Sequence, residues 1–171
     1  MVSPDPDVEA ILDILSRHEV RYLIIGGIAA VLFGSPYPTD DLDICADEKG
    51  PNRQRLSEAL IELNAREWDP HKGEFVDREW TDDMLAVDRT WLLETRFGRL
   101  DILFAPAGTG GYPDLARRRQ MIRLGDRDVP VSAIEDLIRM KEAAGRERDR
   151  LQVPTLRKML EEWRHQQRES E

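Results

Sequence analysis

Residues 25–44 read Ile-Gly-Gly-Ile-Ala-Ala-Val-Leu-Phe-Gly-Ser-Pro-Tyr-Pro-Thr-Asp-Asp-Leu-Asp-Ile, and this stretch decides the fold. It begins with a glycine pair at the end of a short apolar run. It ends with two carboxylates two residues apart, Asp41 and Asp43. Successive side chains of a β-strand point to opposite faces. We therefore expect Leu42 and Ile44 to face the core, while the two acids share the other face.

Two carboxylates held side by side on a rigid strand repel each other unless a cation lies between them. Carboxylate oxygens are the ligands that hard divalent cations prefer. Asp41 and Asp43 therefore predict a divalent metal site. Asp101 is the candidate for a third ligand, because it is a solitary acid among apolar neighbours in a second strand-like run, Arg99–Phe104.

The composition bounds the class of protein. The 171 residues carry a formal net charge of −9, and 35% of them are charged. These totals favour one soluble globular unit and argue against a protein that coats nucleic acid, although a local basic patch can act against an acidic average. The single cysteine, Cys45, cannot form an internal disulfide. With no signal-peptide pattern and no long apolar run, we expect a cytoplasmic protein without membrane contact.

Helical and strand-like patterns alternate along the chain. The patterns predict helices over 5–18, 28–33, 51–63, 112–119, 132–144 and around 156–163, and strands over 21–25, 39–46, 91–94, 99–104, 121–124 and 129–131. Residues 65–83 show no readable pattern. Ser132 and Glu135 are expected to form a capping box. The expected fold is α+β, a mixed sheet flanked by helices, with a core over residues 1–131 and a C-terminal helical part over 132–171.

Other metal and phosphate motifs fit this chain less well. An EF-hand loop would need an oxygen ligand where Cys45 stands and a glycine where Ala46 stands. A Walker loop would need a lysine after Gly34, and the chain has Ser35 and Pro36 there. The Asp-x-Asp of haloacid-dehalogenase-type phosphatases follows an apolar run, whereas residues 38–40 are Pro-Thr-Asp. Phosphohydrolase activity is therefore a third hypothesis. The glycine-rich stretch 108–111 lacks a lysine and is interpreted as a connector.

The order of strand, Gly-Gly, short helix, Gly-Ser, extended link and Asp-x-Asp strand resembles the polymerase β-type nucleotidyltransferase superfamily. It is most similar to minimal bacterial nucleotidyltransferases related to the toxin half of AbiE-type (AbiEii-like) toxin–antitoxin pairs. The residues that match are Gly26, Gly27, Ala29, Gly34, Thr39, Asp41 and Asp43. A weaker similarity follows over 137–149. Two positions depart from the pattern, since Tyr37 replaces a usual arginine and Phe33 a common histidine.

The resemblance implies a polymerase β-like fold and Mg²⁺-dependent transfer of NMP from an NTP to a hydroxyl, with release of pyrophosphate. It implies two Mg²⁺ ions, and Asp41, Asp43 and Asp101 as both metal ligands and catalytic residues. Glycine amides at the start of a helix can approach phosphates closely. The implied nucleotide-binding residues are Gly26, Gly27, Ser35, Thr39 and Lys141.

The resemblance leaves the acceptor open. The toxin-like branch implies tRNA 3′ ends and an antitoxin partner, whereas other branches use proteins or small molecules such as aminoglycosides. The one dense basic cluster, Arg117–Arg119, fits either RNA phosphates or internal ion pairs. Lys141 is alternatively a solvated helix residue, and Asp149 the partner of a nearby arginine. The alternative to catalysis is a degenerate fold that acts as a binding or antitoxin-like module.

Overall fold

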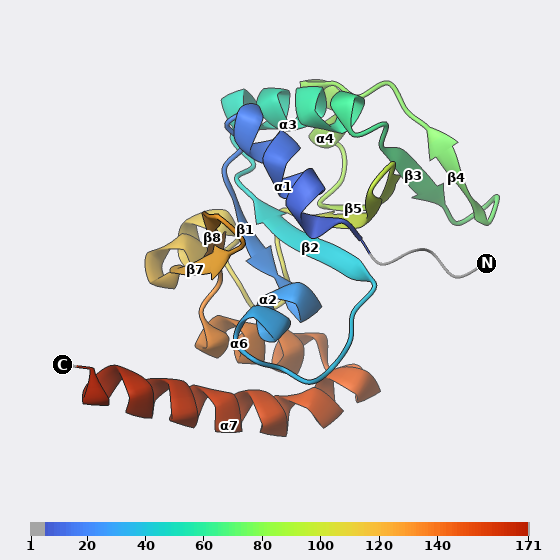
Figure 1. Ribbon diagram of the computed structural model, residues 1–171. Coiled ribbons are helices and arrows are strands. Elements are labelled where there is room, and N and C mark those ends of the chain that lie inside the picture. Colours follow the sequence, from blue (N-terminus) through green and yellow to red (C-terminus); the bar gives the residue numbers. More distant parts are fainter. Residues whose placement is uncertain (1–5, 171) are drawn as a thin grey trace.

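The computed structural model describes residues 6–170 and contains one mixed sheet (Figure 1). Its strands are β1 (Tyr22–Ile25), β2 (Asp41–Ala46), β3 (Arg66–Asp69), β4 (Glu74–Asp77), β5 (Thr90–Thr95), β6 (Gly98–Leu103), β7 (Gln120–Leu124) and β8 (Arg127–Val131). Their order in the sheet is β4-β3-β5-β6-β2-β1-β8-β7. β2 is antiparallel to β1 and parallel to β6, which confirms the mixed sheet expected from the sequence.

Helices flank this sheet. They are α1 (Val8–Arg17), α2 (Gly26–Leu32), α3 (Gly50–Glu62), α4 (Asp82–Leu85), α5 (Tyr112–Leu115), α6 (Ile134–Ala144) and α7 (Glu147–Glu169), with a 3-10 turn, η1 (Ala116–Arg118), after α5. Figure 1 shows α1, α3 and α4 gathered at one end of the molecule and α2, α6 and α7 at the other. The predicted α+β class is thus confirmed.

The alternating pattern of β2 has the predicted orientation. Leu42 and Ile44 are completely buried in the core, whereas Asp41 and Asp43 on the opposite face are partly exposed. Cys45 is also buried, because β1 and β6 flank β2 on both sides. Burial of the apolar side chains therefore determines which face of β2 presents the acids.

The stretch without a readable pattern contains a hairpin that the sequence analysis missed. β3 and β4 pair antiparallel, and Trp68 packs edge-to-face on Phe75, with ring centroids 5.2 Å apart. The hairpin lies at the edge of the sheet, and no residue of either strand is fully buried. A strand that buries neither face has no strong alternation to recognise. Further along, Trp80 is buried and its Nε1 donates to the carbonyl of Ala65 at 2.9 Å.

Several helix boundaries differ from the predictions, and the helix predicted over 112–119 is α5 followed by the 3-10 turn η1. The predicted capping box is wrong, because the N-cap of α6 is Ala133 and the Oγ of the buried Ser132 has no hydrogen-bond partner among residues 6–170. α2 already begins at Gly26. α7 begins at Glu147 and continues through Pro154, ahead of the apolar spacing that marked it in the sequence. The end of α6 is as predicted, with Gly145 in the left-handed conformation at φ 64°.

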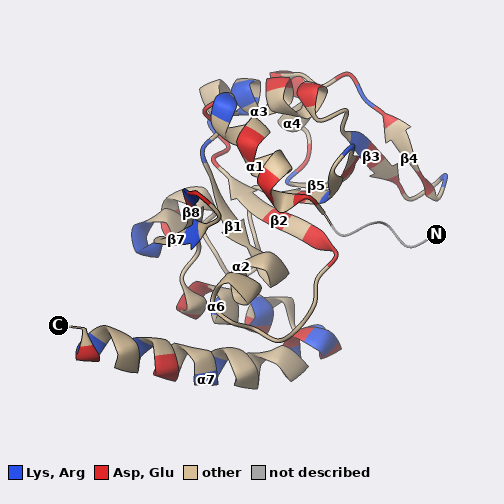
Figure 2. Ribbon diagram, viewed as in Figure 1, with Lys and Arg blue, Asp and Glu red and all other residues tan. Residues whose placement is uncertain are grey.

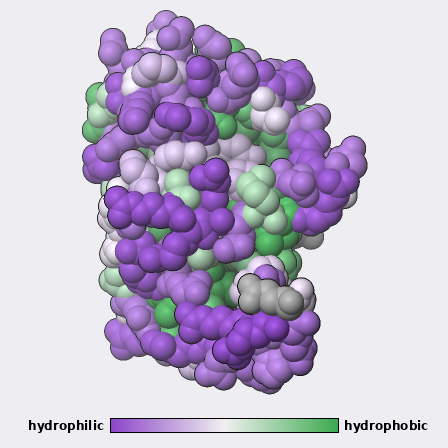
Figure 3. Space-filling model, turned by 90° about the vertical axis from the view of Figure 1, so that its left-hand side faces the viewer, coloured by the Kyte–Doolittle hydropathy of each residue, from purple (hydrophilic) through white to green (hydrophobic). Residues whose placement is uncertain are grey.

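Acidic and basic residues are interspersed over the helices and strands (Figure 2). The face drawn in Figure 3 is mainly hydrophilic, and hydrophobic residues show in small separate areas. Within residues 6–170, no helix is both long enough and apolar enough to span a membrane.

Candidate active site

One cavity of about 900 Å³ is built around the stretch that decides the fold. The sheet supplies one wall, and the ends of α2, α6 and α7 supply others. All of the site residues predicted from the sequence line this cavity: Gly26, Gly27, Ser35, Thr39, Asp41, Asp43, Asp101 and Lys141. The fold therefore brings together residues that are more than one hundred positions apart in the sequence.

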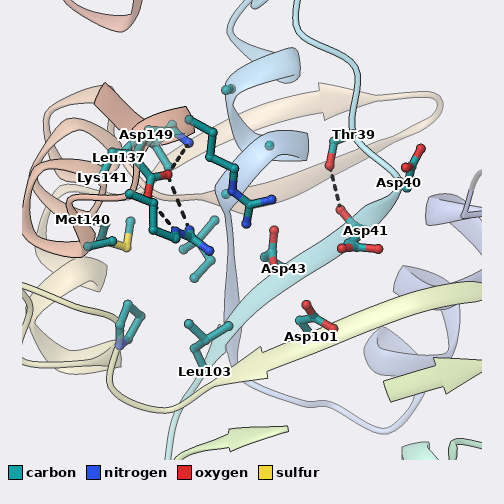
Figure 4. Close-up of a pocket in the computed structure, with 18 of the residues that line it drawn as sticks. Thr39, Asp40, Asp41, Asp43, Asp101, Leu103, Leu137, Met140, Lys141 and Asp149 are labelled. Atoms are coloured by element: carbon teal, nitrogen blue, oxygen red, sulfur yellow. Dashed lines mark hydrogen bonds and ion pairs between the residues drawn. The ribbon is translucent and has the colours of Figure 1, made fainter. Parts of the chain in front are cut away.

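The strand register places the three acids on one face. β2 and β6 run parallel, and Asp43 is the register partner of Asp101. Asp41 lies two residues before Asp43 and so points to the same side. Figure 4 shows all three carboxylates directed into the same space, while Lys141 lies across the cavity from Asp41.

Two of the acids, Asp43 and Asp101, have strongly raised pKa values. Burial, together with the negative charges of Asp101 and Asp41, raises the pKa of Asp43 to about 7. Burial and the charge of Asp41 raise the pKa of Asp101 to about 6, against the opposing effect of Arg99. The buried Oδ1 of Asp101 has no hydrogen-bond partner in the described part of the chain. A cation bound between these carboxylates would reduce their mutual repulsion and give the Oδ1 of Asp101 a partner. The carboxylate oxygens therefore fit a divalent metal ion.

The arrangement of the acids is not that of a formed metal centre. Across the described residues, 6–170, no three His, Cys, Asp or Glu side chains are grouped so that they could hold a metal ion. Mutual repulsion of the carboxylates favours this separation. The metal site therefore stays a prediction.

The two glycines allow α2 to approach β2 closely. A Cβ atom on Gly27 would lie 2.7 Å from the Oγ1 of Thr39, and one on Gly26 would lie 2.9 Å from the Cγ of Asp43. Gly26 also has a φ of +66°, a conformation that side chains other than glycine rarely adopt. The hydroxyl of Thr39 donates to the carbonyl of Asp41 at 3.3 Å. The glycine pair thus makes room for two predicted site residues, a role that the sequence analysis did not foresee.

Positive charge gathers on the opposite side of the cavity. The Nζ of Lys141 lies 3.4 Å from the Oδ1 of Asp149, and the Nε of Arg146 donates to its Oδ2 at 2.7 Å. Asp149 is buried, and Arg148 also lines the cavity. The interpretation of Asp149 as the partner of an arginine is confirmed. Sequence reasoning missed Arg146 and Arg148 as cavity residues, although both belong to the stretch after Gly145 in which arginines alternate with acids.

Arg99 is a third residue that sequence reasoning missed. Its Nε lies 3.8 Å from the Oδ1 of Asp41, and its Nη2 lies 3.9 Å from the Oδ1 of Asp101. The guanidinium also lies 5.3 Å from the centre of the Phe75 ring. Arg99 therefore supplies positive charge between two of the three acids. Its spacing of two residues from Asp101 on the same strand was the signal that could have revealed it.

The basic cluster Arg117–Arg119 lies elsewhere. Arg118 forms an ion pair with Asp136, which is completely buried in α6, and the Nη1 of Arg119 donates to the carbonyl of Ala116 at 3.3 Å. Neither arginine lines the cavity around the three acids. For Arg118, the internal ion pair is the correct interpretation.

Comparison with protein-family profiles gave no match, and neither did comparison with curated proteins. Solved structures do match. The lincosamide antibiotic adenylyltransferase LnuA, with lincomycin bound, has a TM-score of 0.60 at 20% identity over 89% of this chain and 95% of its own. A Thermotoga maritima protein described as a nucleotidyltransferase has a TM-score of 0.56 at 21% identity over 91% of each chain. ANT(2″)-Ia in complex with adenylyl-2″-tobramycin has a TM-score of 0.50 at 20% identity over 77% of this chain and 70% of its own.

These likenesses show that the chain has the nucleotidyltransferase fold, as the sequence predicted. Because the identities are low, they establish the fold and not the reaction. The finer relation to AbiE-type toxins stays a prediction.

Proposed function

We propose that this protein is a metal-dependent nucleotidyltransferase that moves NMP from an NTP to a hydroxyl acceptor and releases pyrophosphate. The observation that carries the proposal is the register pairing of Asp43 with Asp101, beside Asp41, in a cavity whose opposite wall is basic. The three acids can bind metal ions, and the basic residues on the opposite wall can bind phosphate groups. Together they suit a metal-bound nucleoside triphosphate as the substrate.

The three carboxylates Asp41, Asp43 and Asp101 would hold two Mg²⁺ ions. When bound, two such ions about 4 Å apart stabilise the entering and leaving oxygens of an in-line displacement. The raised pKa values of Asp43 and Asp101 mean that ion binding must displace protons from these groups near neutral pH. The two acids on β2 and the one on β6 are fixed by their strands, so the protein presents them on one rigid face.

The basic wall would receive the triphosphate. Arg146 and Lys141 are ordered by the buried Asp149, and Arg148 lies beside them in the cavity. The charges of Lys141 and Arg148 reach the acids, because both oppose the rise in the pKa of Asp43. Ser35 and Thr39 line the same space and offer hydroxyl groups to phosphate or to metal-bound water. The backbone amides of Gly26 and Gly27 would donate hydrogen bonds to the same phosphates.

The acceptor is proposed to be a small-molecule hydroxyl in preference to tRNA. Arg118, in the predicted RNA-binding cluster, is engaged with a buried acid, and the cluster's Arg118 and Arg119 are not part of the cavity lining. The solved structures with this fold include an enzyme bound to lincomycin and one bound to adenylyl-tobramycin. A tRNA acceptor and an antitoxin partner, as in a toxin–antitoxin pair, form the alternative.

The experiment that tests the donor half is calorimetric titration of the protein with each NTP in the presence of Mg²⁺. Asp43→Asn is the test variant, and Asp128→Asn on the β7–β8 hairpin is the matched control. We expect Mg²⁺-dependent NTP binding that Asp43→Asn abolishes and Asp128→Asn retains. Absence of NTP binding to the wild-type protein would contradict the proposal. Incubation with an α-labelled NTP and, in separate reactions, lincomycin, tobramycin or total tRNA then identifies the acceptor class.

A degenerate nucleotidyltransferase fold that serves as a binding module is the second candidate. The observation that favours it is the absence, among residues 6–170, of acids grouped closely enough to hold a metal ion. The two candidates differ in the response to Mg²⁺, which raises the melting temperature only if the carboxylates can converge on the ion. Release of inorganic phosphate from simple phosphoesters would instead support the phosphohydrolase hypothesis.

A further inference from the structure

The wall of the cavity beyond Asp101 carries two apolar side chains, Leu92 and Phe75, and Leu92 lies between Thr90 and Glu94 on β5. On the open face of the sheet, Asp43 is the register partner of Asp101, and Asp101 is the register partner of Leu92 in β5. β3 is antiparallel to β5, and Glu67 is the register partner of Leu93, so the next residue of β3, Trp68, lies toward Leu92. In the hairpin, Trp68 is the register partner of Phe75. A row of side chains thus leads from the acids across the sheet to the β3–β4 hairpin.

Three members of this row form what we name the aromatic platform: Phe75, Trp68 and Leu92. Trp68 is 37% exposed and Leu92 39% exposed, and Phe75 is partly exposed. Phe75 and Leu92 line the cavity, and Trp68 supports the Phe75 ring from the side. Single exposed apolar residues are common on protein surfaces. Three apolar residues that adjoin each other beside the row of acids instead mark a binding surface.

The charges around the platform disfavour a polyanion. The hairpin arginines Arg66 and Arg78 are already paired with Glu94 and Glu67. Arg99, which lies over Phe75, is near the carboxylates of Asp41 and Asp101. β4 itself carries Glu74 and Asp77, which are exposed. A nucleic-acid strand would need cations for its phosphates at this position. An apolar ring without phosphate groups needs none.

We infer that the aromatic platform binds the acceptor, and that the acceptor is a small alcohol with an apolar ring face and no phosphate group. A ring in contact with Leu92 and with the part of Phe75 that lines the cavity directs its hydroxyl along the row toward Asp101, the register partner of Leu92. Arg99 links the aromatic platform to the acids, because its guanidinium lies over Phe75 and also near Asp41 and Asp101. The inference rests on the proposed nucleotidyl transfer for its catalytic meaning, but the binding surface can be tested alone.

The test uses 2-phenylethanol as the probe and saturation-transfer NMR on the whole protein, with ATP and Mg²⁺ present. We expect binding at millimolar concentration that weakens about tenfold in Phe75→Ala, the loss of one well-placed aromatic contact. Leu92→Ala, which changes β5 and leaves the Trp68–Phe75 pair of the hairpin present, should weaken binding as well. Val76→Ala is the matched control, since Val76 pairs with Glu67 on the other face of the same hairpin and does not line the cavity.

Three outcomes overturn the inference. They are no binding of 2-phenylethanol to the wild-type protein, equal binding in Phe75→Ala, and binding of a short RNA oligonucleotide that depends on Phe75. The ATP-induced shift of the melting temperature is measured in parallel. If ATP does not bind but 2-phenylethanol binding still depends on Phe75, the proposed nucleotidyl transfer is wrong and the platform remains a binding surface. If ATP binds and the probe does not, the platform alone fails.

Discussion

A Cβ atom on Gly26 would lie 2.9 Å from the Cγ of Asp43, and closer still to its Oδ2. The first residue of α2 and the middle of β2 are therefore in contact at a distance that only glycine permits. The side chain of Asp43 is held in place by the backbone of α2 on one side and by its register partner Asp101 on the other. The glycine pair is thus part of the support of the acids.

Gly26→Ala should disturb both the backbone and Asp43. The new methyl group adds a collision with the carboxylate to a strained φ of +66°. We expect a loss of about 1–3 kcal/mol in the free energy of unfolding, measured by urea denaturation, and loss of Mg²⁺-dependent NTP binding. Gly34→Ala is the control, because Gly34 has a φ of +103° but, in the described structure, no heavy atom within 4 Å of the Cβ position. If both variants keep NTP binding, the contact with Asp43 has no functional role.

The stability of the metal-free protein should depend on pH through Asp43. Its pKa is raised from 3.8 in the unfolded chain to about 7 in the folded protein. The folded state therefore binds more protons between pH 4 and 7, so the contribution of Asp43 to stability is fully present below pH 4 and is lost as the pH rises from 4 through 7. Asp43→Asn removes this loss, which corresponds to about 4 kcal/mol at pH 8. We expect the variant to melt roughly 10 °C above the wild type at pH 8, since 1 kcal/mol shifts the melting temperature by about 2–4 °C in a domain of this size.

The difference between Asp43→Asn and the wild type should shrink at pH 5, where the wild-type carboxyl is protonated. Addition of Mg²⁺ at pH 8 should raise the melting temperature of the wild type and leave the variant unchanged. Asp40→Asn, at an exposed position in the same cavity, controls for the general effect of net charge. A melting difference that is the same at pH 5 and pH 8 would contradict the assignment.

Arg99 should weaken cation binding. Its guanidinium lies 3.8 Å from Asp41 and 3.9 Å from Asp101, where it competes with a metal ion for the same negative charge. Arg99→Met is expected to bind Mg²⁺ about threefold to tenfold more tightly, measured by calorimetry, because a repulsive positive charge has been removed. Arg89→Met serves as the control, since the Arg89–Glu48 pair is exposed and its partner does not line the cavity. Weaker Mg²⁺ binding in Arg99→Met would show that the arginine instead positions the acids.

Lys141 should contribute to NTP binding more than to stability. Its partner Asp149 retains the ion pair with Arg146 when the lysine is replaced. We expect Lys141→Met to weaken NTP binding about tenfold with little change in melting temperature. The surface variant Lys158→Met, which removes an exposed ion pair with Glu162 on α7, is the matched control. A large drop in melting temperature with unchanged NTP binding would assign Lys141 a purely structural role.

The local parts of the candidate site could be predicted from the sequence. The alternation of Leu42 and Ile44 with Asp41 and Asp43 determined which face of β2 carries the acids, because the core accepts only the apolar side chains. Asp101 could be predicted as a site residue because it is the one acid among apolar neighbours in its strand. The boundaries of the β3–β4 hairpin and the start of α7 could not, because these segments bury too little apolar surface to leave a periodic pattern. A division into residues 1–131 and 132–171 stays a prediction.

By itself, the sequence determined the α+β class, the strand that carries the acids, and the glycine pair that precedes it, since each follows from local alternation or backbone freedom. Only the tertiary structure decided which groups face one another. The register of β2 on β6 sets Asp43 beside Asp101, and the packing of α7 on α6 places Arg146 and Lys141 around Asp149. The aromatic platform likewise arises from strand pairing between segments far apart in the chain. Such contacts depend on long-range burial and charge, which no local pattern records.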